Sequence, residues 1–273
     1  MTTAISGQHA PRHVPMTAQL STFWALCERD LWVTVVRQPI PFLAQALLQP
    51  IFFLFIFGRI LPSIGAANAN FASLLFPGIM GLTVFLTALQ SVALPLVIEF
   101  SFTKEIEDRL LAPLATWAVG AQKLVFAMVR GLFAAALMIP LGFLILPNFA
   151  LPNANWLLVV PILMLAAISA ATIGLTLGTK VPFNQINLAF AVILTPLMMT
   201  GAAYYPWASL GSLQWFQIVT LLNPMTYASE GLRGALTPAA PHMDPLFVLL
   251  GLVISIAIFG TIGIRGFIKR AID

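Results

Sequence analysis

Residues 131–179 read GLFAAALMIPLGFLILPNFALPNANWLLVVPILMLAAISAATIGLTLGT and contain no Asp, Glu, Lys or Arg. A helix needs about 20 predominantly apolar residues to cross the hydrocarbon core of a bilayer. This stretch is therefore long enough for two crossings, with a break near Pro147 and Asn148. It predicts two membrane-spanning helices joined by a short loop.

Uncharged stretches also dominate the rest of the chain, over residues 38–58, 60–98, 181–229 and 245–264. The 273 residues are 60% hydrophobic and 8% charged, whereas a soluble domain carries roughly 25% charged residues. We therefore predict an all-α polytopic membrane protein with six crossings. The expected crossings are 42–61, 72–98, 119–146, 156–179, 185–203 and 245–264.

The distribution of basic residues predicts the orientation of these helices. If the amino terminus lies inside, eleven Lys and Arg residues fall on the inner side, and only Arg59 and Arg233 fall outside. Inner loops of membrane proteins carry an excess of Lys and Arg. Both termini are thus expected to be cytoplasmic, in the plasma membrane of a bacterium.

The chain before the first crossing divides into two parts. Residues 1–16 lack an apolar core and are expected to form a disordered cytoplasmic tail. Residues 17–38 place apolar side chains at spacings of three and four, with charges elsewhere around the helix. This pattern predicts an amphipathic helix in the membrane interface. Residues 39–273 form the predicted membrane domain.

Residues 204–236 differ from the crossings, because they hold all three tyrosines and two tryptophans. Such side chains prefer the membrane–water interface. Pro206 and Asn223-Pro224 interrupt the segment, so we expect a re-entrant outer hairpin of short helices before the last crossing. Glu230 and Arg233 are three residues apart and can pair on one helix face.

Few charges fall within or beside the crossings. Glu99 lies at the inner end of the second crossing, where it can pair with Lys123 or Arg130 or act as an inner gate. Lys123 and Arg130 are seven residues apart and share one face of the third crossing. These three residues are the candidates for an inner gate.

Several classes of function lack their sequence signals. No G-x-x-x-x-G-K-[ST] phosphate loop is present, and the three histidines lie in the tail or an outer loop. Cys27, the one cysteine, excludes an internal disulfide, and no metal site is predicted. The 13 basic residues are spread too widely for a nucleic-acid surface.

The most charged segment, KEIEDR at 104–109, lies in the inner loop between the second and third crossings. Residues 102–113 are expected to form a short helix there. Such a helix is either a solvated connector or a docking element for a cytoplasmic partner.

Together these segments resemble the membrane subunits of type-2 ABC export permeases. That family combines Glu-rich charge and a Leu-Leu-x-x-Pro type of sequence after the second crossing with Asn-Pro and Glu-x-x-Arg before the last. The first segment here is KEIEDRLLAP (104–113), and the second is NPMTYASEGLR (223–233). The resemblance extends over about residues 20–270. The Gly-Thr often found between the acids and the leucines is absent, so the chain resembles permeases for polysaccharides and nodulation factors as much as drug or lipid permeases.

The resemblance implies a pair of permease subunits, as a homodimer or a heterodimer, with two cytoplasmic ABC ATPase subunits. The chain would bind no cofactor and would not itself be an enzyme, because ATP and Mg²⁺ would be bound by the partner ATPase. The implied ATPase-coupling residues are Glu105, Glu107, Asp108, Arg109 and Leu110. The implied structural residues of an outer gate are Asn223, Pro224, Glu230 and Arg233.

The favoured hypothesis is export of an amphiphile, such as a drug, a lipid or a glycan conjugate. Its path would be lined by crossings 1, 2 and 5, although phenylalanine on such helices more often faces membrane lipid. The candidate lining residues are Phe52, Phe55, Phe85 and Met198. A partner-independent secondary transporter or channel is the alternative, which the lack of an acid at membrane depth disfavours. A membrane scaffold or a membrane enzyme without transport activity is the third hypothesis. The sequence contains no catalytic cluster that would support the enzyme.

Overall fold

The computed structural model describes residues 16–37, 39–66, 71–103, 105–110, 114–147 and 149–272. Within these ranges all regular structure is helical, and six helices are long and apolar enough to cross a membrane. The six spans are Pro39–Ser63, Leu74–Thr103, Thr116–Ile145, Trp156–Lys180, Phe183–Thr200 and Pro245–Ala271. The predicted fold class, an all-helical polytopic membrane protein, is confirmed. The predicted tail lies outside the described residues, except for Met16.

The helices follow one another in the order that the neutral stretches predict. The first half contains α1 (Met16–Trp32), a π-helical turn (Val33–Arg37), α2 (Pro39–Phe55), a second π-helical turn (Ile56–Ile60), α3 (Leu61–Ser63), α4 (Phe71–Ile98) and a third π-helical turn (Glu99–Thr103). The middle contains α5 (Glu105–Leu110), α6 (Thr116–Ile145), α7 (Trp156–Lys180), a 3₁₀ turn (Phe183–Gln185) and α8 (Ile186–Thr200). The last part contains a 3₁₀ helix (Trp207–Ser212), α9 (Gln214–Thr220), α10 (Pro224–Leu236) and α11 (Pro245–Ile272).

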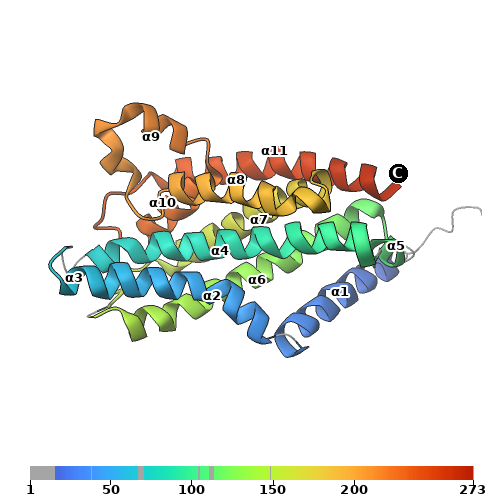
Figure 1. The fold of residues 1–273 in the computed structure, drawn as a ribbon, viewed down its shortest axis with the longest axis horizontal. Helices are drawn as coiled ribbons and strands as arrows, with labels where there is room; N and C mark the ends of the chain where they lie inside the picture. The colour runs from blue at the N-terminus through green and yellow to red at the C-terminus, as the bar shows by residue number, and fades with distance from the viewer. Residues whose placement is uncertain are drawn as a thin grey trace, which may run out of the picture.

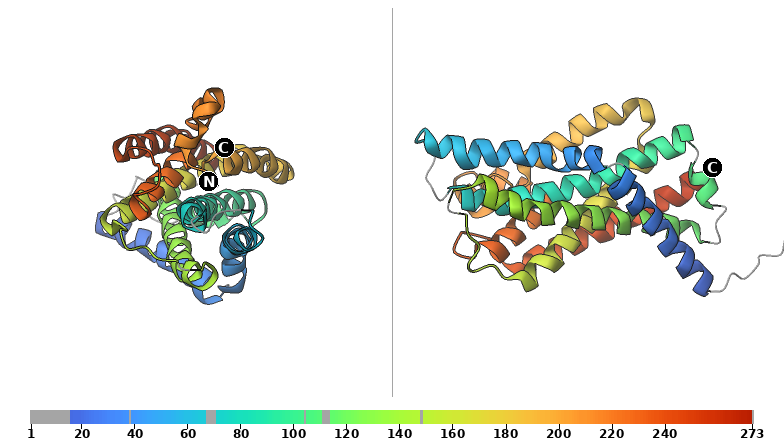
Figure 2. Two further views of the ribbon diagram at one scale, coloured as in Figure 1. Left: turned by 90° about the vertical axis from the view of Figure 1, so that its left-hand side faces the viewer. Right: turned by 90° about the horizontal axis from the view of Figure 1, so that it is seen from below.

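The long helices form one elongated bundle with two distinct ends (Figure 1). At one end lie α5 and the carboxyl terminus, and we call it the α5 end. At the other lie α3, α9 and α10, and we call it the α3 end. Helix α1 runs at an angle to the bundle and packs on α6, as Figures 1 and 2 show. It buries Cys27 and leaves Trp24 and Trp32 exposed, which fits an amphipathic helix at a membrane surface.

The core of the bundle is the contact between α4 and α7, which also pack on α6 and α10. Small residues let the two backbones approach closely, as is common between helices in membranes. A Cβ atom added at Gly174 of α7 would overlap the carbonyl oxygen of Leu89 in α4. By contrast, α2, α8 and α11 are largely unburied within the single chain.

We predict that Gly174→Ala destabilises the bundle, because its methyl group cannot fit without separating α4 from α7. Overpacking of this kind costs about 1–3 kcal/mol. Thermal unfolding of the purified chain measures the effect. Gly211→Ala is the matched control, since no atom of the described residues lies within 4 Å of a Cβ added there. Equal unfolding temperatures for the two variants would contradict the close α4–α7 contact.

Two regions differ in detail from the predicted boundaries. The last helix continues to Ile272 rather than ending at 264, because its final turns stay attached to the bundle. Arg270 donates hydrogen bonds to the carbonyl oxygens of Gly178 and Thr179, at 3.0 and 3.2 Å. Residues 204–236 contain three short helices, as expected. Their re-entry into the membrane stays a prediction.

Candidate coupling site and transport groove

A hydrogen-bonded ion-pair network joins α1, α5 and α6 at the α5 end. Arg109 of α5 donates two hydrogen bonds to the Asp30 carboxylate of α1, at 2.9 and 3.0 Å. Gln122 of α6 donates to the same carboxylate at 3.1 Å. Glu105 of α5 accepts from Arg109 at 3.2 Å and also from Arg29 of α1. We call these five residues the α1–α5–α6 network.

The network is largely shielded from water. The side chain of Arg109 is 4% exposed and that of Asp30 is 11% exposed. Burial alone would raise the pKa of Asp30, but the hydrogen bond and charge of Arg109 outweigh it and lower that pKa. Burial likewise acts to lower the pKa of Arg109, and Asp30 reverses the direction. Both groups are therefore charged at neutral pH, and the short helix α5 is clamped to α1.

The predicted coupling residues fall into two groups. Asp108 is exposed and open to a partner. Arg109 is buried in the network, so the expectation that it contacts an ATPase does not fit its position. Glu105 is partly buried and binds two arginines. The side chains of Glu107 and Leu110 lie outside the described part of the structure.

Sequence reasoning missed the partners of Arg109, which are Asp30 and Gln122. They lie 79 and 13 residues away from it in the chain. Asp30 reads as one more charge on the polar face of an amphipathic helix. The sequence gives only indirect evidence that Asp30 is a partner of Arg109, because an arginine buried in a membrane protein needs an acid nearby.

The candidate inner-gate residues meet beside this network. Lys123 of α6 donates to Glu99 at 2.5 Å, so the predicted pairing with Lys123 is confirmed. Arg130 does not join this pair; its guanidinium lies over the rings of Phe42 and Phe126, at 4.7 and 5.6 Å. Whether these residues act as a gate stays a prediction.

A second polar cluster is buried at the α3 end. Glu230 and Arg233 of α10 form an ion pair with both side chains fully buried, which confirms the predicted pairing. Glu230 accepts hydrogen bonds from the backbone N–H groups of Trp207 and Met243, at 2.9 and 3.0 Å. Arg233 donates to the carbonyl oxygen of Ala202 at 3.1 Å. The pair thus joins α10 to two connecting segments, the one that follows α8 and the one between α10 and α11.

Asn223 caps α10, and Pro224 occupies its first turn. The Asn223 side chain accepts from the N–H of Met225 at 2.9 Å. It also donates to the carbonyl oxygen of Leu197 and to the hydroxyl of Thr200, at 2.7 and 2.9 Å. These bonds attach the start of α10 to the end of α8.

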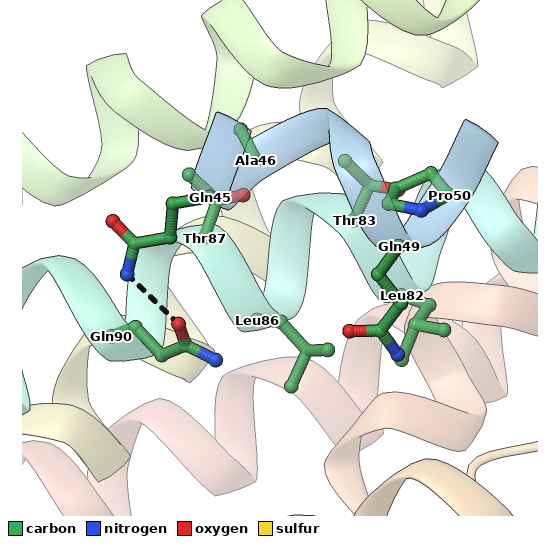
Figure 3. A pocket seen from close by; sticks show the side chains of 9 residues that line it. All are labelled: Gln45, Ala46, Gln49, Pro50, Leu82, Thr83, Leu86, Thr87 and Gln90. Atoms are coloured by element: carbon green, nitrogen blue, oxygen red, sulfur yellow. Dashed lines mark hydrogen bonds between the residues drawn. The ribbon is translucent and has the colours of Figure 1, made fainter. Parts of the chain in front are cut away.

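A polar groove runs between α2 and α4 (Figure 3). Gln45 donates to Gln90 across it at 2.9 Å, and Gln49 donates to the sulfur of Met198 in α8 at 3.8 Å. Thr83 and Thr87 complete the polar lining from α4. Uncharged amides in the membrane-spanning part of the chain need hydrogen-bonding partners, because lipid tails offer none.

The predicted lining residues are placed unequally relative to this groove. Phe52 is 57% exposed and shares one helix face with Gln45 and Gln49, at i+7 and i+3. Phe55 is also exposed, and Met198 is half-buried. Phe85 is fully buried in the core, which does not fit a lining role in this conformation.

Within the described residues, no three His, Cys, Asp or Glu side chains gather in a group that could hold a metal ion. The arrangement offers two charged clusters at opposite ends of the bundle and a neutral polar groove between them.

Comparison with known proteins gives one family. The model of the family described as ABC-2 type transporter matches residues 21–237. The inner membrane transport permease YadH of Escherichia coli K12 is 26% identical over 212 residues, covering 75% of this chain and 80% of its own. The putative transport permease ycf38 of Cyanophora paradoxa is 27% identical over 224 residues, covering 75% of this chain and 71% of its own.

Proposed function

Because the family match covers more than half of its length, the chain belongs to the ABC-2 type transporter family, and we propose that it is the membrane subunit of an ATP-driven exporter. Its ATPase subunits dock at the α5 end. The observation that carries this proposal is the α1–α5–α6 network, which attaches a short helix, with Asp108 exposed, to two longer ones. A displacement of α5 would therefore move α1 and α6 with it, because the three helices are joined by the network.

The proposed orientation puts the α5 end in the cytoplasm. Lys and Arg concentrate on the inner side of the predicted topology, in keeping with the positive-inside rule. Figure 1 supports this assignment, because α5 and the basic end of α11 lie at the same end of the bundle. Both termini would then lie on the side where ATP is available.

We propose that two permease subunits face each other through α2 and α8. These helices are little buried in the single chain, although α4 between them is almost wholly buried. Their exposed apolar side chains include Leu48, Phe52, Leu188 and Val192. The groove of Figure 3 lies beside this face, so it would open onto the space between the subunits. Its neutral amides and the nearby phenylalanine suit an amphiphile.

ATP binding would bring the two ATPase subunits together and move α5 with them. Since α5 is held to α1 and α6, this movement would shift the helices at the α5 end relative to the buried cluster of α10. The path between the subunits would then open toward the α3 end. The chain contributes no chemistry to ATP hydrolysis in this mechanism.

The docking role is tested by reversing the charge of Asp108. Asp108→Arg is expected to reduce co-purification of the ATPase at least about tenfold, equivalent to about 1.4 kcal/mol. The unfolding temperature should not change, because the side chain is exposed. Arg59→Glu, an equally exposed charge reversal near the α3 end, is the control and should leave the complex intact.

If the same amount of ATPase co-purifies with Asp108→Arg as with the parent, α5 is not the docking site. Transport by the purified chain alone in liposomes, driven by an ion gradient, would instead favour a partner-independent secondary transporter.

A further inference from the structure

A cavity of about 460 Å³ lies between α1, α4, α5 and α6 at the α5 end. Its wall includes four cationic side chains and three acidic ones. Three cations are paired with acids: Arg29 with Glu105, Arg109 with Asp30, and Lys123 with Glu99. Arg130 is the fourth cation, so the described residues of the cavity wall carry one positive charge in excess.

Arg130 makes no hydrogen bond or ion pair with any residue that the structure describes, and its Nε atom is buried without a partner. The rings of Phe42 and Phe126 contact its charge. The residue is 14 positions after Thr116 and 15 before Ile145, at the middle of α6. At a rise of about 1.5 Å per residue, this places it about 21 Å from the start of the helix and about 22 Å from its end.

The energies favour a missing partner for this guanidinium. A cation at the centre of a membrane helix costs about 2.5–3.5 kcal/mol or more. Contact with an aromatic face stabilises the cation by about 0.5–2 kcal/mol. An anion in the cavity would offset the free-energy cost that the aromatic contacts leave. A phosphate suits this role, because the planar guanidinium forms paired hydrogen bonds with phosphate oxygens.

The position of the cavity indicates where the anion comes from. Its wall extends from Arg130 to Arg29 of α1 and to Thr34 of the π-helical turn that follows α1. The exposed Trp24 and Trp32 of α1 are side chains that favour the headgroup level of a bilayer. A phosphate from that level would move along the cavity toward Arg130 at the middle of α6, while its acyl chains stay in the membrane. Arg130 can extend toward it, as long basic side chains do.

We propose that this cavity binds the phosphate group of an anionic membrane lipid, with Arg130 as its main ligand. Lys123 stands beside the bound group but remains neutralised by Glu99. The proposal does not depend on the exporter function, because lipid binding requires neither an ATPase nor transport.

The test compares variants of the purified chain in vesicles of phosphatidylcholine mixed with phosphatidylglycerol. Retained lipid is measured by native mass spectrometry after detergent extraction. Arg130→Gln is expected to lower retention of phosphatidylglycerol on the order of tenfold, a loss of about 1.4 kcal/mol of binding. Arg130→Lys should keep part of the retention. Lys180→Gln, an exposed cation outside the cavity, should keep all of it.

Thermal unfolding gives a second readout that does not depend on extraction. A ligand that binds only the folded state raises the unfolding temperature. Phosphatidylglycerol should therefore stabilise the parent and Lys180→Gln but not Arg130→Gln. Equal retention and equal stabilisation in the parent and Arg130→Gln would overturn the proposal. Displacement of the lipid by inorganic phosphate would also overturn it, and would assign the cavity to a soluble anion.

Discussion

Arg109→Ala is expected to destabilise the folded chain by about 3–5 kcal/mol, the usual cost of removing one partner from a buried ion pair. The substitution would leave Asp30 at 11% exposure without the two hydrogen bonds that hold it. Gln122 cannot replace the paired geometry of a guanidinium, and Arg29 of α1 is bonded to Glu105 instead. Unfolding of the purified chain in a denaturing detergent series measures the loss.

The double variant Asp30→Ala with Arg109→Ala separates stability from coupling. Removing both charges avoids the unpaired buried acid, so the double variant should be more stable than Arg109→Ala alone. It should nevertheless remain defective in ATP hydrolysis by the complex with its ATPase, because α5 is no longer attached to α1. A fully active double variant would show that this attachment does not transmit movement.

Arg29→Ala is the matched control within the same network. Arg29 is bonded to Glu105 but its side chain is 54% exposed. Exposed ion pairs contribute about 0–1 kcal/mol, so this variant should fold and couple almost normally. A loss of stability as large as that of Arg109→Ala would show that positive charge near α5, rather than the buried Arg109–Asp30 pair, stabilises the chain.

The six crossings could be predicted because the requirement behind them is simple. A helix in lipid must be apolar over its length, and a stretch such as 181–229 carries no charge at all. The end of the last helix was harder to predict. The charges at Arg265 and Arg270 end the apolar run, but not the hydrogen bonding that keeps the helix on α7.

The candidate sites were predictable where the partners are close in the chain. Glu230 and Arg233 are three residues apart on one helix, so spacing alone indicates their contact. Asp30 and Arg109 meet only because α1 folds back along α6, which no local pattern shows. Spacing also could not show that Arg109 turns inward while its neighbour Asp108 turns outward.

The contrast between Phe52 and Phe85 has the same origin. Both lie on uncharged helices and look alike in the sequence, but α4 is surrounded by other helices and α2 has an open side. The number of neighbours around a helix decides which of its faces remains exposed. In a membrane chain every face is apolar, so hydropathy does not distinguish them. The polar groove between Gln45 and Gln90 is the better marker of the open side.

Glu230→Ala is expected to lower the free energy of unfolding by at least as much as Arg109→Ala, because both members of the Glu230–Arg233 pair are fully buried. The variant leaves the Arg233 guanidinium with the Ala202 carbonyl as its remaining partner among the described residues. It also leaves the N–H groups of Trp207 and Met243 without their acceptor. The charge contributes about 3–5 kcal/mol, and each buried group left unpaired adds about 1–3 kcal/mol. The purified chain should therefore unfold at markedly lower denaturant, or fail to accumulate.

Glu28→Ala removes an exposed acid from α1 and should leave stability within about 0.5 kcal/mol of the parent. The informative variant is Glu230→Met with Arg233→Met, which removes both buried charges and keeps side-chain volume. If the pair only holds α10 in place, this double variant should recover about 3–5 kcal/mol, the part due to the unpaired charge, but not the cost of the unpaired Trp207 and Met243 N–H groups, and should also recover the ATP-driven activity. If the pair belongs to an outer gate, stability should recover while activity stays low, since the contacts to Trp207 and Met243 that move with the gate are gone. A double variant as unstable as Glu230→Ala would contradict both expectations, because the two charges would then contribute nothing beyond the backbone contacts they make.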